Sequence, residues 1–179
     1  MIRMASYKSA KSLLSKLALV TVTESFINLN FFYYILNMNF IRLKIILGYL
    51  GFLPFAFFTI LPMIFGEVLA IWSLQILSIY GGIILSFLAG MTWGWPEKES
   101  NNYNLLIGIL FSLSGFLIIL LAESFLIYSM IVNLFSFPLF YLFEKKRGLF
   151  FKNEDYVKLR LYLTSGVSGC FLFGFLNFF

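Results

Sequence analysis

Few side chains in this sequence could take part in chemistry. Its 179 residues include no histidine and a single cysteine, Cys170. A thiol needs a group that favours its thiolate form before it acts as a nucleophile, and zinc sites are usually built from several cysteines and histidines. The sequence also has no glycine-rich nucleotide-binding loop. We therefore expect no catalytic residue, no metal site and no cofactor, and we expect that the protein is not an enzyme.

The remaining candidates are carboxylates and amides inside or beside long apolar segments. Ionisable residues within a membrane-spanning helix often mark a transport path or a proton relay. Glu67 and Glu123, however, fall at breaks between apolar segments, where we expect them to flank helix ends. Asn133 falls near the middle of an apolar segment and is expected to bond to a neighbouring helix. The alternative is that Asn133 and Gln75 line a path for a solute.

The segments that hold these residues have the composition of a membrane protein. The sequence is 61% hydrophobic and only 12% charged, whereas soluble domains carry about 25% charged residues. Because a helix needs about 20 apolar residues to cross a bilayer, we predict an all-α polytopic membrane protein with five transmembrane helices. The predicted spans are residues 43–65, 68–93, 105–122, 125–143 and 158–177.

An N-terminal extension, residues 1–40, precedes the predicted membrane bundle at 41–179. On a helical wheel Lys8, Lys11 and Lys16 lie on one side and apolar residues on the other, which predicts a basic amphipathic helix. We expect this interfacial helix to lie on an anionic membrane surface. Its serine-rich, acid-poor composition also resembles a mitochondrial transit peptide that would be cleaved.

The basic residues predict the orientation of the five spans. All 13 Lys and Arg residues fall in or beside the extension and the loops at 96–104 and 144–158, which share one side of this topology. Lys and Arg are enriched on the inner side of membrane proteins, so the N-terminus is expected inside. Trp72, Trp93 and Trp95 are expected at the membrane–water interfaces. Because topology already accounts for the basic residues, we do not expect nucleic-acid binding.

Small residues recur at intervals of four in two of the predicted spans. Such a stripe allows a second helix to approach closely, which favours helix association within a bilayer. We expect these stripes to pack the helices of the bundle against each other, and the alternative is that one of them docks onto a partner protein. The two stripes consist of Ser78, Gly82, Ser86, Gly90 and Gly94, and of Gly166, Cys170 and Gly174.

Three segments in these spans resemble a known family. They are LGYLGFLPF at 47–55, YGGIILSFLAGMTWGW at 80–95 and LRLYLTSGV at 159–167. They resemble the small polytopic membrane proteins related to transmembrane protein 69, whose shared domain has no assigned function. The resemblance implies a five-span bundle in a bacterial or mitochondrial inner membrane, and it implies no catalytic residues. Its most specific residues are Tyr80, Gly81, Ser86, Phe87, Gly90, Trp93 and Gly94.

Packing motifs without reactive groups suggest a structural role. We expect a non-catalytic integral subunit of a larger inner-membrane complex, such as a respiratory one, with membrane lipids and other integral subunits as partners. The alternatives are a small channel or carrier and a membrane assembly factor. A composition rich in Lys, Phe, Ile, Asn and Tyr is typical of an AT-rich genome. With the transit-like extension, it favours the mitochondrial inner membrane, N-terminus in the matrix, over a bacterial inner membrane with a cytoplasmic N-terminus.

Overall fold

The structure is a computed structural model that describes residues 40–95, 102–147, 151 and 153–178. The predicted amphipathic helix with Lys8, Lys11 and Lys16 lies outside these described residues. The chain divides into two units, residues 1–43 and 44–179. Nearly all of the described residues belong to the second unit, and the account below concerns that unit alone.

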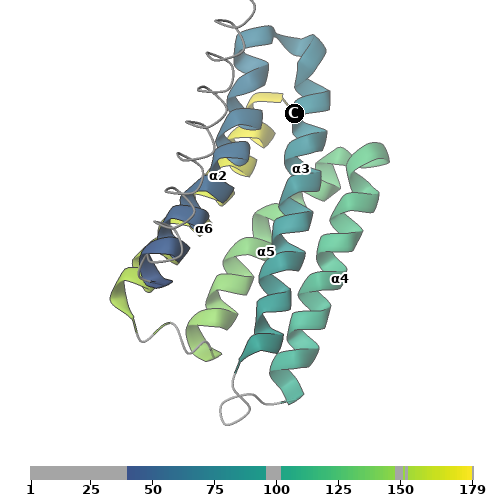
Figure 1. Cartoon of the computed structure of the whole chain (residues 1–179). Coiled ribbons are helices and arrows are strands. Elements are labelled where there is room, and N and C mark those ends of the chain that lie inside the picture. Colours follow the sequence, from purple (N-terminus) through teal and green to yellow (C-terminus); the bar gives the residue numbers. More distant parts are fainter. Residues whose placement is uncertain (1–39, 96–101, 148–150, 152, 179) are drawn as a thin grey trace, which may run out of the picture. The chain divides into compact units, whose positions relative to one another are not determined.

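All regular structure in the described residues is helical, as the sequence predicted. Five helices are long and apolar enough to cross a membrane. They run up and down in turn (Figure 1), and a short 3₁₀ helix follows the second of them. The elements are α2 (Phe40–Phe65), α3 (Glu67–Gly90), η1 (Met91–Gly94), α4 (Asn102–Ser124), α5 (Leu126–Arg147) and α6 (Glu154–Phe178).

Two tight turns join the helices at one end of the bundle. Gly66 separates α2 from α3 and has a φ of 77°, a left-handed conformation that favours glycine. Its N–H donates to the carbonyl of Pro62 at 2.9 Å, which closes the last turn of α2. Glu67 is the first residue of α3, where the sequence predicted a helix start. Phe125 alone separates α4 from α5, next to the predicted break.

The core of the bundle joins four helices through aromatic rings. Helix α3 packs against both α4 and α5, and α5 also packs against α6. Phe55 of α2 is buried, and its ring centroid lies 4.9 Å from that of Tyr80, 5.9 Å from that of Phe137 and 6.0 Å from that of Phe171. These three rings belong to α3, α5 and α6. Aromatic pairs at such distances stabilise packing beyond the area they bury, so Phe55 links α2 to the other helices.

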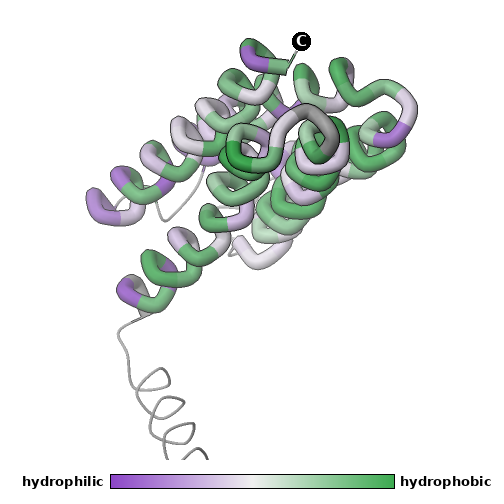
Figure 2. The backbone as a smooth tube through the Cα atoms, turned by 90° about the horizontal axis from the view of Figure 1, so that it is seen from above, coloured by the Kyte–Doolittle hydropathy of each residue, from purple (hydrophilic) through white to green (hydrophobic). Residues whose placement is uncertain are grey.

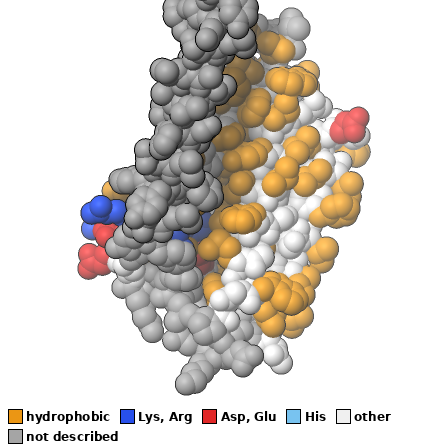
Figure 3. All heavy atoms as spheres, in the orientation of Figure 1, with side chains coloured by type: hydrophobic (Ala, Val, Ile, Leu, Met, Phe, Trp, Pro, Cys, Tyr) orange, Lys and Arg blue, Asp and Glu red, His pale blue; other side chains and the backbone are white. Residues whose placement is uncertain are grey.

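The outer surface is apolar along most of the length of the helices. Figure 2 shows hydrophobic residues along the helices and hydrophilic ones mainly near the helix ends. Large side chains such as those of Phe87 and Leu176 are exposed, and Figure 3 shows hydrophobic side chains spread over the visible face. Such extensive apolar exposure is unusual for a soluble monomer. It is the surface expected of helices that face lipid.

Candidate functional site

Helices α3 and α4 meet through small residues. A Cβ placed on Gly82 of α3 would lie 2.7 Å from the carbonyl oxygen of Gly115 in α4. One turn further along α3, the Ser86 hydroxyl donates to the carbonyl of Ser112 at 3.2 Å. The inner stripe residues Gly82 and Ser86 therefore lie where α4 comes closest, as small residues at a helix crossing allow.

The same stripe leaves this contact at its far end. Residues four apart on an α-helix are rotated by roughly 40° relative to each other, because each residue turns the helix by about 100°. Gly90 and Gly94 are exposed, and a Cβ on either would meet none of the described atoms within 4 Å. Gly94 also belongs to η1 rather than to α3. Ala89 and Thr92 take over the contact, since both lie against Gly108 of α4.

The second predicted stripe contacts two different neighbours. A Cβ on Gly166 would lie 2.8 Å from the ring of Phe52 in α2. A Cβ on Gly174 would lie 2.9 Å from the side chain of Leu74 in α3. Cys170 lies between them and is a half-buried free thiol. The stripe therefore faces α2 at one end and α3 at the other.

The predicted interfacial tryptophans differ in exposure. Trp72 and Trp93 are exposed, Trp93 by 64% of its surface, which suits an indole at a membrane–water interface. Trp95 is only 8% exposed, and its ring stacks on Phe143 of α5 with the centroids 5.8 Å apart. Trp95 therefore packs inside the bundle instead of facing lipid, because η1 turns the chain back over the helices.

A polar cluster joins three helices in the bundle interior. The Asn133 amide of α5 donates to the Ser78 hydroxyl of α3 at 2.9 Å, so the predicted bond to a neighbouring helix is confirmed. Ser129 donates its hydroxyl proton to the carbonyl of Ile118 in α4 at 2.8 Å. Ser78 and Ser129 lie 2.5 Å apart, and Ser78 must therefore be the donor between them. Gln75 likewise donates to a backbone carbonyl, that of Glu123, at 3.4 Å.

A buried ion pair connects the end of α5 to the start of α6. Arg160 donates from Nε to Oε2 of Glu144 at 2.7 Å, and its Nη2 lies 2.5 Å from the same oxygen. The Tyr156 hydroxyl donates to the other carboxylate oxygen, Oε1, at 2.6 Å. Glu144 is 5% exposed and Arg160 7%. Buried charges are stable only when paired and hydrogen-bonded in this way.

The sequence gave little sign of this pair. Glu144 and Arg160 both fall at the edges of a segment, 144–158, that reads as a charged loop, and they are 16 residues apart. The one available signal is the spacing of Tyr156 and Arg160, since residues four apart lie on the same face of a helix. That signal became useful only once α6 was known to begin at Glu154.

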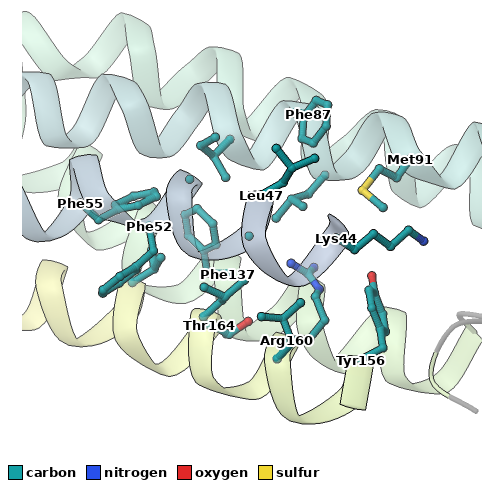
Figure 4. Close-up of a pocket in the computed structure, with 17 residues that line it drawn as sticks. Lys44, Leu47, Phe52, Phe55, Phe87, Met91, Phe137, Tyr156, Arg160 and Thr164 are labelled. Carbon is teal, nitrogen blue, oxygen red and sulfur yellow. The ribbon is translucent and has the colours of Figure 1, made fainter. Parts of the chain in front are cut away.

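A cavity of about 350 Å³ lies beside this ion pair, between α2, α3, α5 and α6. Figure 4 shows its two ends: Phe52 and Phe55 at one, and Lys44 and Tyr156 at the other. Apolar side chains form most of the lining. Its size falls within the range of small-molecule sites in proteins, about 300–1,000 Å³.

The polar end of the cavity is the positively charged end of the bundle. The Lys44 ammonium lies 5.5 Å from the centre of the Tyr156 ring, and Arg160 lines the cavity between its two ends. Within the described residues of the second unit, this end carries six basic and three acidic side chains. The basic ones are Lys44, Lys145, Lys146, Arg147, Lys158 and Arg160, and the acidic ones are Glu144, Glu154 and Asp155.

The described residues contain no group of three or more His, Cys, Asp or Glu side chains placed to hold a metal ion. Neither the curated proteins nor the solved structures contain a match to this chain. A family model matches residues 41–176, which include all five long helices except for their outermost residues. The chain therefore belongs to the family described as Protein of unknown function (DUF3429).

Proposed function

We propose that the protein is a non-catalytic integral subunit of a larger inner-membrane complex, where it packs helices together and contacts lipid. The observation that carries this proposal is the use of its buried polar side chains. Asn133 and Ser78 join α5 to α3, and Glu144 and Arg160 join α5 to α6. Polar groups used in this way hold helices in a fixed arrangement. The same use supports a structural role over an enzymatic one.

The partners in this proposal are lipids and other integral subunits. Gly90 and Gly94 extend the small-residue stripe beyond the contact with α4, onto the exposed surface of α3 and η1. The inner part of that stripe already allows one helix to approach closely, at Gly82. We expect a transmembrane helix of a partner subunit to use the exposed part in the same way.

Native gel electrophoresis of the full chain from its own membrane tests this proposal. In mild detergent the chain is expected to migrate with a complex much larger than its own 20.7 kDa. Gly90→Leu is expected to release it, because the larger side chain would hold a partner helix away. Gly169→Leu is the matched control, since Gly169 is also exposed with open space at its Cβ. Migration of the unmodified chain as a monomer would contradict the proposal.

The proposed location is the mitochondrial inner membrane, with the N-terminus in the matrix and a respiratory complex as the partner. A bacterial inner membrane with a cytoplasmic N-terminus is the alternative. The basic end of the bundle supports the orientation, because Lys and Arg collect on the inner side. The proposal also includes the basic amphipathic helix on the inner membrane surface and the kinship with transmembrane protein 69.

Cysteine labelling tests the orientation. In a Cys170→Ser background, Glu123→Cys and Lys146→Cys place exposed thiols at opposite ends of the bundle. We expect a membrane-impermeant maleimide added to intact mitoplasts, or to spheroplasts of a bacterial host, to label Glu123→Cys alone. Lys146→Cys should react only after the membrane is permeabilised. The reverse pattern would refute the proposed orientation.

A further inference from the structure

The cavity between α2, α3, α5 and α6 has the length of one lipid leaflet. Its lining on α2 runs from Lys44 to Phe55, and on α6 from Tyr156 to Val167. Eleven helical steps correspond to about 16 Å at 1.5 Å per residue. Half of a bilayer's hydrocarbon core is about 15 Å. An extended acyl chain that crosses one leaflet would therefore fit along the cavity.

The cavity is open to the surrounding lipid on one side. Leu47 of α2 and Phe87 of α3 both line it, and both are also exposed on the outer surface of the bundle (Figure 4). A lipid could thus enter from the bilayer without passing through water. A second acyl chain could lie outside, along the same exposed side chains. This opening suits a lipid with two chains better than a single-chain amphiphile.

The polar end of the cavity suits an anionic headgroup. Lys44 lies one turn from the start of α2, near the level where the hydrocarbon core meets the headgroups. Lysine binds phosphate as a compact point charge. Glu144 neutralises much of the charge of Arg160 through the buried ion pair, so Lys44 is the principal cation for a ligand. The excess of basic side chains at this end adds to the attraction for anions.

We propose that this cavity binds one acyl chain of an anionic phospholipid, with the lipid phosphate at Lys44. The apolar lining accepts the chain, and the charge at one end selects the headgroup. The ion pair of Glu144 and Arg160 holds α5 and α6 apart at the distance the cavity requires. This site goes beyond the proposed role as a subunit, because a single copy of the chain contains all of it.

Native mass spectrometry of the purified full chain tests this site. The probes are dioleoyl phosphatidylglycerol and dioleoyl phosphatidylcholine, which have the same chains and differ in headgroup charge. We expect the anionic lipid to bind about fivefold more tightly, the effect of one lysine near an anionic headgroup. Lys44→Gln should remove this preference without abolishing the binding of either lipid. Equal binding of the two lipids to the unmodified chain would overturn the proposal.

Filling the cavity should block both lipids. Gly51 lines the cavity, and its Cβ would meet no described atom within 4 Å, so Gly51→Phe places a ring in the cavity with little strain. We expect this variant to lose at least about tenfold in affinity for both lipids, a loss of the order expected for apolar contact area. Gly169→Leu, on the outer surface of α6, is the matched control and should bind as the unmodified chain does. Unchanged binding to Gly51→Phe would overturn the proposal.

An oleate arm separates a phospholipid from a free fatty acid. Oleate carries a negative charge and one of the same chains, but it lacks the second chain that would lie along Leu47 and Phe87. We expect it to bind more weakly than phosphatidylglycerol. Equal or tighter binding of oleate would show that the site selects a fatty acid and would overturn the proposal as stated. None of these outcomes alters the native gel result, because binding is measured on the isolated chain.

Discussion

Arg160→Met is expected to lower the free energy of unfolding by about 3–5 kcal/mol, the largest effect of any single substitution considered for this chain. The substitution keeps most of the volume of the side chain but removes its charge. Glu144 would then remain buried without its ion-pair partner, still bonded to the Tyr156 hydroxyl. Unfolding in mixed micelles with increasing dodecyl sulfate, followed by far-ultraviolet circular dichroism, measures the change.

The double variant Glu144→Gln with Arg160→Met distinguishes lost charge pairing from lost packing. Glutamine keeps an oxygen that accepts the Tyr156 hydroxyl, and no uncompensated charge remains. The double variant should therefore be clearly more stable than Arg160→Met alone. Glu154→Gln is the surface control, because the Glu154 and Lys158 side chains lie 3.9 Å apart and are largely exposed, and such pairs contribute about 0–1 kcal/mol. If Arg160→Met costs no more than Glu154→Gln, the buried pair does not stabilise the bundle.

Gly82→Ala is expected to destabilise the bundle by about 1–3 kcal/mol, the usual cost of overpacking. The added methyl group would lie 2.7 Å from the carbonyl oxygen of Gly115. Because that oxygen belongs to the backbone of α4, it cannot move aside as a flexible side chain would. The two helices would have to separate, and the Ser86 bond to α4 would lengthen with them. The same unfolding measurement in mixed micelles reports the loss.

Gly90→Ala provides the matched control for this prediction. Gly90 is in the same helix and the same stripe, yet a Cβ there would meet no described atom within 4 Å. Alanine also has a better helix propensity than glycine, so the variant should be as stable as the unmodified chain or slightly more so. Equal losses in Gly82→Ala and Gly90→Ala would show that helix propensity, rather than the close approach to α4, sets the effect.

The five spans could be predicted from the sequence because the bilayer leaves few alternatives. Backbone groups in hydrocarbon must bond within the segment, so each long apolar run must become a helix. The ends were less predictable. Helix α5 continues to Arg147 and α6 begins at Glu154, whereas hydropathy placed these boundaries at 143 and 158. Charged residues extend into the headgroup region while the backbone remains helical, and a hydropathy pattern cannot register that extension.

The candidate site was less predictable than the spans. The spacing of the small residues identified a packing surface on α3, but it could not show that the helix rotates Gly90 and Gly94 away from α4. The cavity depends on side chains from four helices, and its boundaries follow from how those helices approach each other. The bond from Asn133 was foreseen because a buried amide within a bilayer requires a partner. Its particular partner, Ser78, depended on the register of α5 against α3.

The ion pair between Glu144 and Arg160 also bears on how the protein enters its membrane. The final turn of α5 carries a carboxylate that is costly to desolvate unless its arginine partner is in place, and that partner is supplied by α6. Arg160 has the same requirement in reverse. The two helices are therefore expected to reach their final depth together, as an inserted hairpin, and each depends on the other to leave the aqueous boundary.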